Sequence, residues 1–275
     1  MVGFVILHYK NISDTIECIE SVLRIKGNKK IIVVDNHSLS KEELKKINNY
    51  PVEVLCLEDN FGFAKANNAG CNHLMQEYNP DFIAVLNNDI VINDDAFIDK
   101  ILSDYHKYNF DILGPKIICD GDSVNPFPVI YGKDNVKAEI KKCKKLIRIY
   151  DNAFLYVLLK IYIGIKHFFK KPVRLKNGDK LVKNVALHGC AIIFSNKYLK
   201  KYEDAFYNET FLFHEEEFIY NRIVNDMLTS IYDPKIELIH KEGSSIKNTN
   251  KNQRKRKLFK EKERLKSLDL LLKQY

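Results

Sequence analysis

Polar residues follow two apolar runs of this sequence at the point where each run ends. Residues 81–86 are followed by Asn87-Asn88-Asp89, and residues 31–34 are followed by Asp35 and Asn36. Packing alone gives no reason for an apolar strand to end in two amides and a carboxylate. Oxygen ligands of this kind hold Mg²⁺ or Mn²⁺ against phosphate. The sequence therefore predicts one site at these strand ends, with a phosphate or a metal ion as its occupant.

A run of three acids, Glu215-Glu216-Glu217, offers a second kind of chemistry. Such a run commonly begins a helix, where the helix dipole stabilises negative charge. Here aromatic residues stand on both sides, Phe213 before the acids and Phe218 after them, so at least one acid is expected to face inward or into a cleft. Aromatic surroundings disfavour the charged form of a carboxyl and can adjust it to act as a general base.

Two further residues each have a structural and a functional interpretation. Asp35 is either a turn acid or a carboxylate that accepts a hydrogen bond from a pyrimidine base or a ribose hydroxyl. His240 follows the strand-like residues 236–239. A lone histidine is commonly structural, but this one is a candidate metal ligand because the chain already contains a metal-type acid at a strand end.

Residues 60–70 combine a glycine at a strand-to-helix turn, Gly62, with several small residues. Tight packing of a helix against the sheet explains the small residues. Asn67 and Asn68 are poor helix formers, so a polar contact is expected for at least one of them. The segment is not a Gly-x-Gly-x-x-Gly fingerprint, and the chain has no P-loop motif.

The elements that would position these residues alternate along the chain. Apolar runs at 2–7, 31–34, 52–57, 82–86 and 111–118 are interpreted as strands, with helices from 13, after a capping box at Ser40 and Glu43, at 62–77 and at 94–108. This alternation predicts an α/β fold with a mostly parallel sheet and helices on both faces. Ligands of such sheets bind at the carboxyl ends of the strands.

Charge is unevenly distributed along the 275 residues. The net charge is +8, yet residues 133–176 contain 13 Lys/Arg against 3 Asp/Glu, and residues 241–275 contain 12 against 4. The rest of the chain is therefore acidic, which favours a metal there and an anionic surface at the two basic segments. This is not the charge pattern of a uniformly basic nucleic-acid binder, so no nucleic-acid partner is expected.

The cysteines and the remaining segments indicate where in the cell the protein is expected to lie. The six cysteines form no Cys-x-x-Cys pair and are expected to be buried thiols in a reducing compartment. No signal peptide and no transmembrane helix are predicted. Residues 137–171 are basic and apolar together, so we expect them to lie at a membrane interface; internal packing is the alternative. The leucine-containing tail at 253–274 is expected to form a helix that packs on its own domain or on a partner subunit.

Taken together, these segments resemble the family-2 glycosyltransferases of the GT-A fold, especially the bacterial rhamnosyltransferase-like branch. The resemblance covers about residues 2–118 and 182–246 and depends on the order and spacing of its pieces. These are residues 5–11, 33–38, 60–70, 86–89 and 188–190, then Glu215-Glu216 with Arg222, and His240. It implies a GT-A domain at 1–246, with an irregular basic insertion at 120–180, followed by a basic C-terminal helix at 247–275.

The resemblance also implies roles for individual residues. Asp89, in a triplet similar to the family's Asp-x-Asp motif, and His240 would hold Mg²⁺ or Mn²⁺, and Glu216 would be the general base, with Glu215 and then Glu217 as alternatives. The residues implied at the donor nucleotide are His8, Tyr9, Asn11, Asp35, Asn60, Gly62, Lys65, Asn68, Asn87 and Asn88. Those implied on the acceptor side are His188, Gly189 and Arg222.

The implied activity is inverting transfer of a sugar from a UDP- or dTDP-sugar, with dTDP-rhamnose as one candidate, to a glycan or a lipid-linked acceptor. The context would be bacterial surface polysaccharide synthesis in the cytoplasm, with peripheral contact to the inner face of the membrane. Because the first residue of the metal triplet is Asn87, the triplet contains one carboxylate. The alternative is therefore a catalytically inactive relative that serves as an assembly partner. A nucleotide-binding oxidoreductase is disfavoured because His8-Tyr9-Lys10-Asn11 replaces the glycine fingerprint after the first strand.

Overall fold

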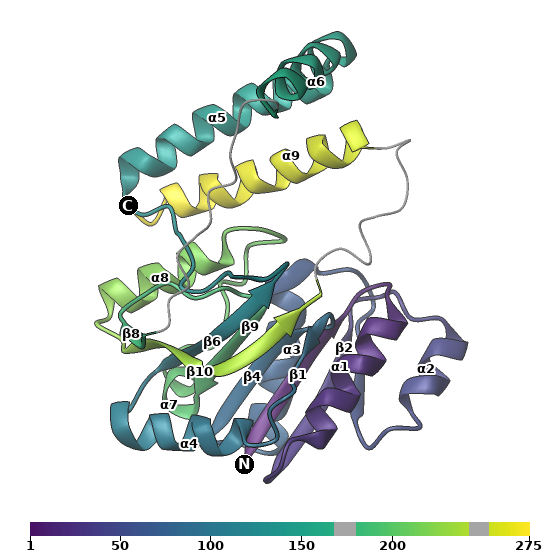
Figure 1. The fold of residues 1–275 in the computed structure, drawn as a ribbon, viewed down its shortest axis with the longest axis vertical. Helices are drawn as coiled ribbons and strands as arrows, with labels where there is room; N and C mark the ends of the chain where they lie inside the picture. Colours follow the sequence, from purple (N-terminus) through teal and green to yellow (C-terminus); the bar gives the residue numbers. More distant parts are fainter. Residues whose placement is uncertain (168–179, 242–252) are drawn as a thin grey trace.

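The computed structural model describes residues 1–167, 180–241 and 253–275, and its central element is a single mixed sheet (Figure 1). The strands are β1 (Val2–His8), β2 (Lys29–Asp35), β3 (Glu53–Cys56), β4 (Phe82–Asn87), β5 (Ile90–Val91), β6 (Ile112–Cys119), β7 (Asp122–Ser123), β8 (Val182–Lys183), β9 (Ala191–Ser195) and β10 (Ser230–His240). The helices are α1 (Ile12–Arg24), α2 (Lys41–Ile47), α3 (Gly62–Glu77), α4 (Phe97–Tyr108), α5 (Lys133–Asp151), α6 (Ala153–His167), α7 (Asn196–Lys201), α8 (Glu215–Asn225) and α9 (Gln253–Leu272).

The sheet has the strand order β3-β2-β1-β4-β9-β6-β10-β5. Strands β1 to β4 pair in parallel, as the alternating pattern predicted. Strand β9, in contrast, runs antiparallel between β4 and β6, so the sheet is mixed. Strand β9 begins beside the carboxyl end of β4, where the backbone N–H of Asn87 donates to the carbonyl of Cys190 over 2.8 Å. The segment His188-Gly189-Cys190 is thereby placed beside the Asn87 triplet.

Helices cover both faces of the sheet. Strand β1 is apolar throughout because both of its faces are buried. Phe4 and Ile6 pack with α1, α2 and α4 on one side, and Val5 and Leu7 pack with α3, α7 and α8 on the other. The predicted capping box is present at the start of α2, formed by Ser40 and Glu43. The expected placement of helices on both faces of the sheet is therefore confirmed.

Helices α5, α6 and α9 form a further layer beyond the carboxyl ends of the parallel strands (Figure 1). Helix α9 packs beside α5 and on α8 through a small apolar cluster. Its buried members are Val136, Ile140, Cys143, Phe218, Leu268 and Leu271. The predicted C-terminal helix is thus present, and it packs on its own chain. The predicted domain boundary after residue 246 lies outside the described residues, as does the end of the basic segment at 168–171.

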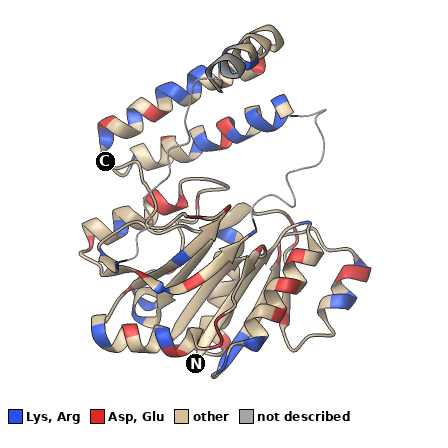
Figure 2. Ribbon diagram, viewed as in Figure 1, with Lys and Arg blue, Asp and Glu red and all other residues tan. Residues whose placement is uncertain are grey.

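Lys and Arg residues recur along α5 and α9 (Figure 2). Among the described residues, no helix is both long enough and apolar enough to span a bilayer. All six cysteines are free thiols, and only Cys56 is exposed.

Candidate active site

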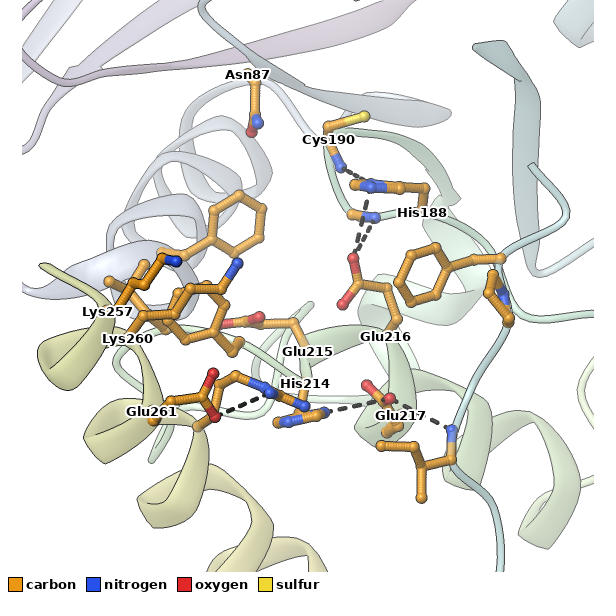
Figure 3. A pocket seen from close by; sticks show the side chains of 18 of the residues that line it. Asn87, His188, Cys190, His214, Glu215, Glu216, Glu217, Lys257, Lys260 and Glu261 are labelled. Carbon is orange, nitrogen blue, oxygen red and sulfur yellow. Dashed lines mark hydrogen bonds and ion pairs between the residues drawn. The ribbon is translucent and has the colours of Figure 1, made fainter. Parts of the chain in front are cut away.

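A cavity of about 760 Å³ lies between the carboxyl edge of the sheet and the helical layer. Asn87 at the end of β4 lies on one side of it, and the start of α8 and one face of α9 form other walls (Figure 3). The structure therefore brings together the strand-end amide, the acidic run and the segment at 188–190, although they are far apart in the sequence.

Glu216 is held in this cavity by one oxygen. Its Oε1 accepts a hydrogen bond from the backbone N–H of Gly189 over 3.0 Å, which leaves Oε2 for another partner. A Cβ on Gly189 would lie 3.2 Å from Glu216 Oε1, so the close approach favours glycine. Burial raises the pKa of Glu216 and repulsion from Glu217 adds to that rise, while the Gly189 hydrogen bond opposes it.

The two neighbouring acids are in different environments. Glu215 is buried, and its Oε1 has no hydrogen-bond partner among the described residues. Burial, followed by repulsion from Glu216, raises the pKa of Glu215 to about 8, so its carboxyl is mostly protonated at neutral pH. Glu217 turns toward His214 (Figure 3), with 3.2 Å between its Oε1 and His214 Nδ1. Of the three acids, Glu216 is the best placed to accept a proton from a ligand.

His188 stands beside Glu216, close enough to form an ion pair with it only when the imidazole is protonated. The backbone N–H of Cys190 donates to His188 Nδ1 over 3.1 Å, so this nitrogen carries a lone pair and any single proton is on Nε2. With the imidazole neutral, the 3.7 Å between His188 Nδ1 and Glu216 Oε1 is therefore a contact between two acceptors. His188 instead packs its ring against Phe127, with centroids 4.8 Å apart.

The loop before α8 is fixed by the first residues of α3. Gly62 has a φ of +79°, and a Cβ there would lie 2.1 Å from the carbonyl oxygen of Phe211. The next residue, Phe63, donates its N–H to the same oxygen over 2.7 Å. Phe213 and His214 follow with φ values of 73° and 72°, which are uncommon for residues other than glycine. This strained entry directs the acidic start of α8 at the cavity.

Asp89 and His240 meet at the carboxyl edge of the sheet. His240 Nε2 lies 3.2 Å from Asp89 Oδ1, an ion pair only when the imidazole is protonated, and Oδ1 is buried without a hydrogen-bond partner among the described residues. A cation between these two groups would satisfy that oxygen. They supply two ligands, and no cluster of three or more His, Cys, Asp or Glu side chains suited to a metal is found in the described ranges. They fit an ion that takes its remaining ligands from phosphate or water.

Several residues predicted at the donor nucleotide are engaged in the protein itself. Asp35 accepts hydrogen bonds from the backbone N–H groups of Ser38 and Leu39. His8 is fully buried, with Nδ1 2.6 Å from Thr15 Oγ1, and burial lowers its pKa. Asn88 donates to Thr15 Oγ1 over 3.0 Å. These contacts explain how the strand ends keep their shape.

The other residues predicted at the donor nucleotide or acceptor either support the backbone through hydrogen bonds or are exposed on the surface. Asn11 caps α1, and Asn60 accepts the Gly62 N–H over 3.0 Å. Asn68 exchanges two hydrogen bonds with the backbone of Phe206, at 3.0 and 2.9 Å. Tyr9 and Lys65 are exposed, and Arg222 donates to the carbonyls of residues 204 and 205, at 2.8 and 3.0 Å, outside the cavity lining.

Sequence reasoning missed the outer wall of the cavity. Tyr150 at the end of α5 and Lys257, Lys260, Glu261 and Arg264 of α9 line it. The spacing i, i+3, i+4 and i+7 places the four α9 residues on one helical face, a pattern visible in the sequence. Nothing local to that pattern indicates that this face lies over the acids of α8, because long-range packing places it there.

Solved structures of similar fold include residues 1–349 of TarS from S. aureus, 13% identical with a TM-score of 0.53 over 85% of this chain and 60% of that one. A second is the mannosyltransferase PcManGT from Pyrobaculum calidifontis in complex with GDP-Man and Mn²⁺, 9% identical with a TM-score of 0.54 over 89% and 58%. This chain therefore spans about three fifths of each of those chains. At these identities the likeness shows the fold alone, which is the predicted GT-A fold.

Comparison with curated proteins finds no match. The family model described as "Glycosyl transferase family 2" matches residues 4–175, which is more than half of the chain and includes most of β1, β2 to β7, the Asn87 triplet and α5. This chain belongs to glycosyltransferase family 2.

Proposed function

We propose that this protein transfers a sugar from a nucleotide-diphospho-sugar to an acceptor hydroxyl with inversion at the anomeric carbon. The observation that carries the proposal is Glu216, which is held by Gly189 in a cavity that also contains Asn87 at the end of β4. A carboxylate with a raised pKa, at the strand ends where ligands of α/β sheets bind, is suited to be a general base.

In this mechanism Glu216 Oε2 takes the proton of the acceptor hydroxyl. The hydroxyl oxygen forms a bond to the anomeric carbon as the bond from that carbon to the diphosphate breaks, and the nucleoside diphosphate leaves with the electron pair. Gly189 keeps Glu216 oriented through its N–H. Glu215, with its pKa raised to about 8, carries a proton at neutral pH and so limits the repulsion on the base.

Asp89 and His240 would hold Mg²⁺ or Mn²⁺, since Asp89 Oδ1 is buried and lacks a hydrogen-bond partner among the described residues. A bound divalent ion would supply positive charge to the departing diphosphate. The single carboxylate fits this role because such ions commonly use one or two protein carboxylates together with phosphate oxygens.

The donor is proposed to be a uridine or thymidine diphospho-sugar, with dTDP-rhamnose as one candidate, and Asp35 is proposed to face its base. A thermal-shift panel of nucleotide-sugars with Mn²⁺, followed by assay of nucleoside diphosphate release, tests this. A saturating donor is expected to raise the Tm by about 5 °C or more, and to be slowly hydrolysed. If no donor shifts the Tm and none is hydrolysed, the chain is instead a catalytically inactive relative.

We propose that acceptors are glycans or lipid-linked sugars and that α6 contacts the inner face of the membrane. Tyr156 is buried and anchors α6 to Tyr150, with ring centroids 5.8 Å apart. The neighbouring apolar side chains are exposed instead, namely Phe154, Leu155, Val157, Leu158 and Ile161. Exposed basic residues of α5 lie nearby, so the face has the apolar and cationic character of an interfacial helix.

Replacing Phe154 and Leu158 by serine is expected to weaken binding to vesicles of phosphatidylglycerol and phosphatidylcholine by at least about tenfold, because each side chain loses on the order of 1.5 kcal/mol or more of burial. Cosedimentation with the vesicles at low salt measures this binding. The matched control replaces Val224 and Met227, which are exposed on the α/β body, and should bind vesicles like the unchanged protein. Equal binding by all three proteins would contradict the assignment of α6.

A further inference from the structure

The outer wall of the cavity contains two lysines that form no ion pair with any described residue. Helix α9 presents Lys257, Lys260 and Arg264 to the cavity. Arg264 is already paired, at 3.0 Å from Glu261 and 3.5 Å from Glu139. Neither lysine has a carboxylate within ion-pair distance in the part of the chain that the structure describes. Their positive charges therefore remain available to a ligand.

Aromatic rings hold both lysines in place. Lys257 Nζ lies 5.7 Å from the ring centroid of Tyr156 and 5.9 Å from that of Tyr150. Lys260 Nζ lies 5.3 Å from the ring centroid of Phe213. Cation–π contacts of this kind fix an ammonium group without cancelling its charge.

The helix that carries these lysines is firmly attached. Ser267 donates its hydroxyl to the carbonyl of Leu212 over 3.0 Å, in the loop that leads to the acids of α8. At the end of the chain, Tyr275 donates to Asn221 over 2.8 Å. The positions of the lysines relative to Glu216 are thus set by direct contacts between α9, α8 and the loop before α8.

The lysines and Asn87 come from different walls of the cavity, the lysines from α9 and Asn87 from the end of β4 (Figure 3). Asn87 belongs to the strand end proposed to receive the donor, so the lysine wall faces the space left for the acceptor. Two ammonium groups one helical turn apart match a compact dianion, and lysine binds phosphate as a point charge. The planar fork of an arginine would add bidentate geometry for a carboxylate or a phosphate, but Arg264 is already engaged.

We propose that the acceptor carries a phosphate or diphosphate group and that Lys257 and Lys260 bind it. The inference deepens the proposed transferase function and rests on it. Tyr156, whose ring lies beside Lys257, belongs to α6, next to the exposed apolar side chains of that helix. A diphosphate on a lipid chain would therefore reach the cavity with its chain near α6, whereas a soluble phosphorylated glycan would use the lysines alone.

The test is direct binding of farnesyl diphosphate and of inorganic pyrophosphate in EDTA by titration calorimetry. The double variant Lys257→Gln/Lys260→Gln keeps the first two methylenes of each stem but removes both charges, and it is expected to weaken binding of both probes by at least about tenfold. The matched control, Lys255→Gln/Lys262→Gln, removes two exposed charges of the same helix that do not line the cavity and should bind both probes normally.

Tighter binding of farnesyl diphosphate than of pyrophosphate supports a lipid-linked acceptor, and equal binding supports a soluble phosphorylated one. The inference is overturned if neither probe binds, if the double variant binds as well as the unchanged protein, or if the control loses as much. It is also overturned if the double variant loses the Tm shift given by the donor with Mn²⁺, because the lysines would then serve the donor. Binding of the two probes needs no turnover. A failure of the transferase proposal, which the donor assay tests, can therefore be distinguished from a failure of this inference.

Discussion

Glu216→Gln is expected to lower kcat for sugar transfer by about 10²- to 10⁴-fold, the usual contribution of a positioned general base. Glutamine preserves the shape of the side chain and can still accept the Gly189 N–H, which glutamate holds at 3.0 Å. What it cannot do is take a proton from the acceptor hydroxyl. Donor affinity should change little, so the loss should appear in kcat rather than in the donor-induced Tm shift.

The matched control is Glu217→Gln. Glu217 belongs to the same acidic run, but its carboxylate faces His214 and the N–H of Ile130, so most of the activity should remain. Near-normal transfer by Glu216→Gln, or an equal loss in both variants, would contradict the assignment.

The pH dependence adds an independent measurement. Because burial raises the pKa of Glu216 and a base must be deprotonated to act, the rate should fall as pH decreases through a midpoint above the ordinary glutamate value. In the Glu216→Gln variant this acidic limb should disappear from whatever rate remains.

The fold was predictable from the sequence because its signals are local. Apolar runs such as residues 2–7 correspond to strands buried on both faces, and the Ser40–Glu43 capping box is visible in four residues. The direction of β9 was not predictable in this way. It depends on a chain that returns to the carboxyl end of β4 after the helical insertion, and no periodicity in residues 191–195 records this return.

Only part of the candidate site was predicted from the sequence, for a related reason. The sequence indicated an inward-facing acid in the run Glu215-Glu216-Glu217 and a polar contact for Asn67 or Asn68, and Asn68 does bond the backbone of Phe206. It did not indicate the hydrogen bond from Gly189 to Glu216, nor the position of Lys257 and Lys260 over the cavity. Both depend on contacts between segments far apart in the chain, which residue types and spacing do not encode locally.

The metal proposal leads to two substitutions with opposite expected effects. Asp89→Asn retains the shape of the side chain but removes the one carboxylate of the triplet, so both Mn²⁺ affinity in the presence of a donor and kcat/KM are expected to fall by on the order of a hundredfold or more. Asn87→Asp adds a second carboxylate at the end of the same strand and is expected to tighten Mn²⁺ binding. Calorimetric titration of Mn²⁺ and activity as a function of Mn²⁺ concentration measure both.

The pair of variants separates charge from shape. Asp89 and Asn87 are two residues apart, and each change swaps an amide and a carboxylate of nearly equal size, so a general disturbance of the loop would weaken Mn²⁺ binding in both. Opposite shifts would show that carboxylate charge at this strand end controls the ion. If EDTA leaves the unchanged protein fully active and Asp89→Asn is unaffected, the positive charge on the leaving diphosphate must come from protein side chains, and the assignment of Asp89 and His240 as metal ligands fails.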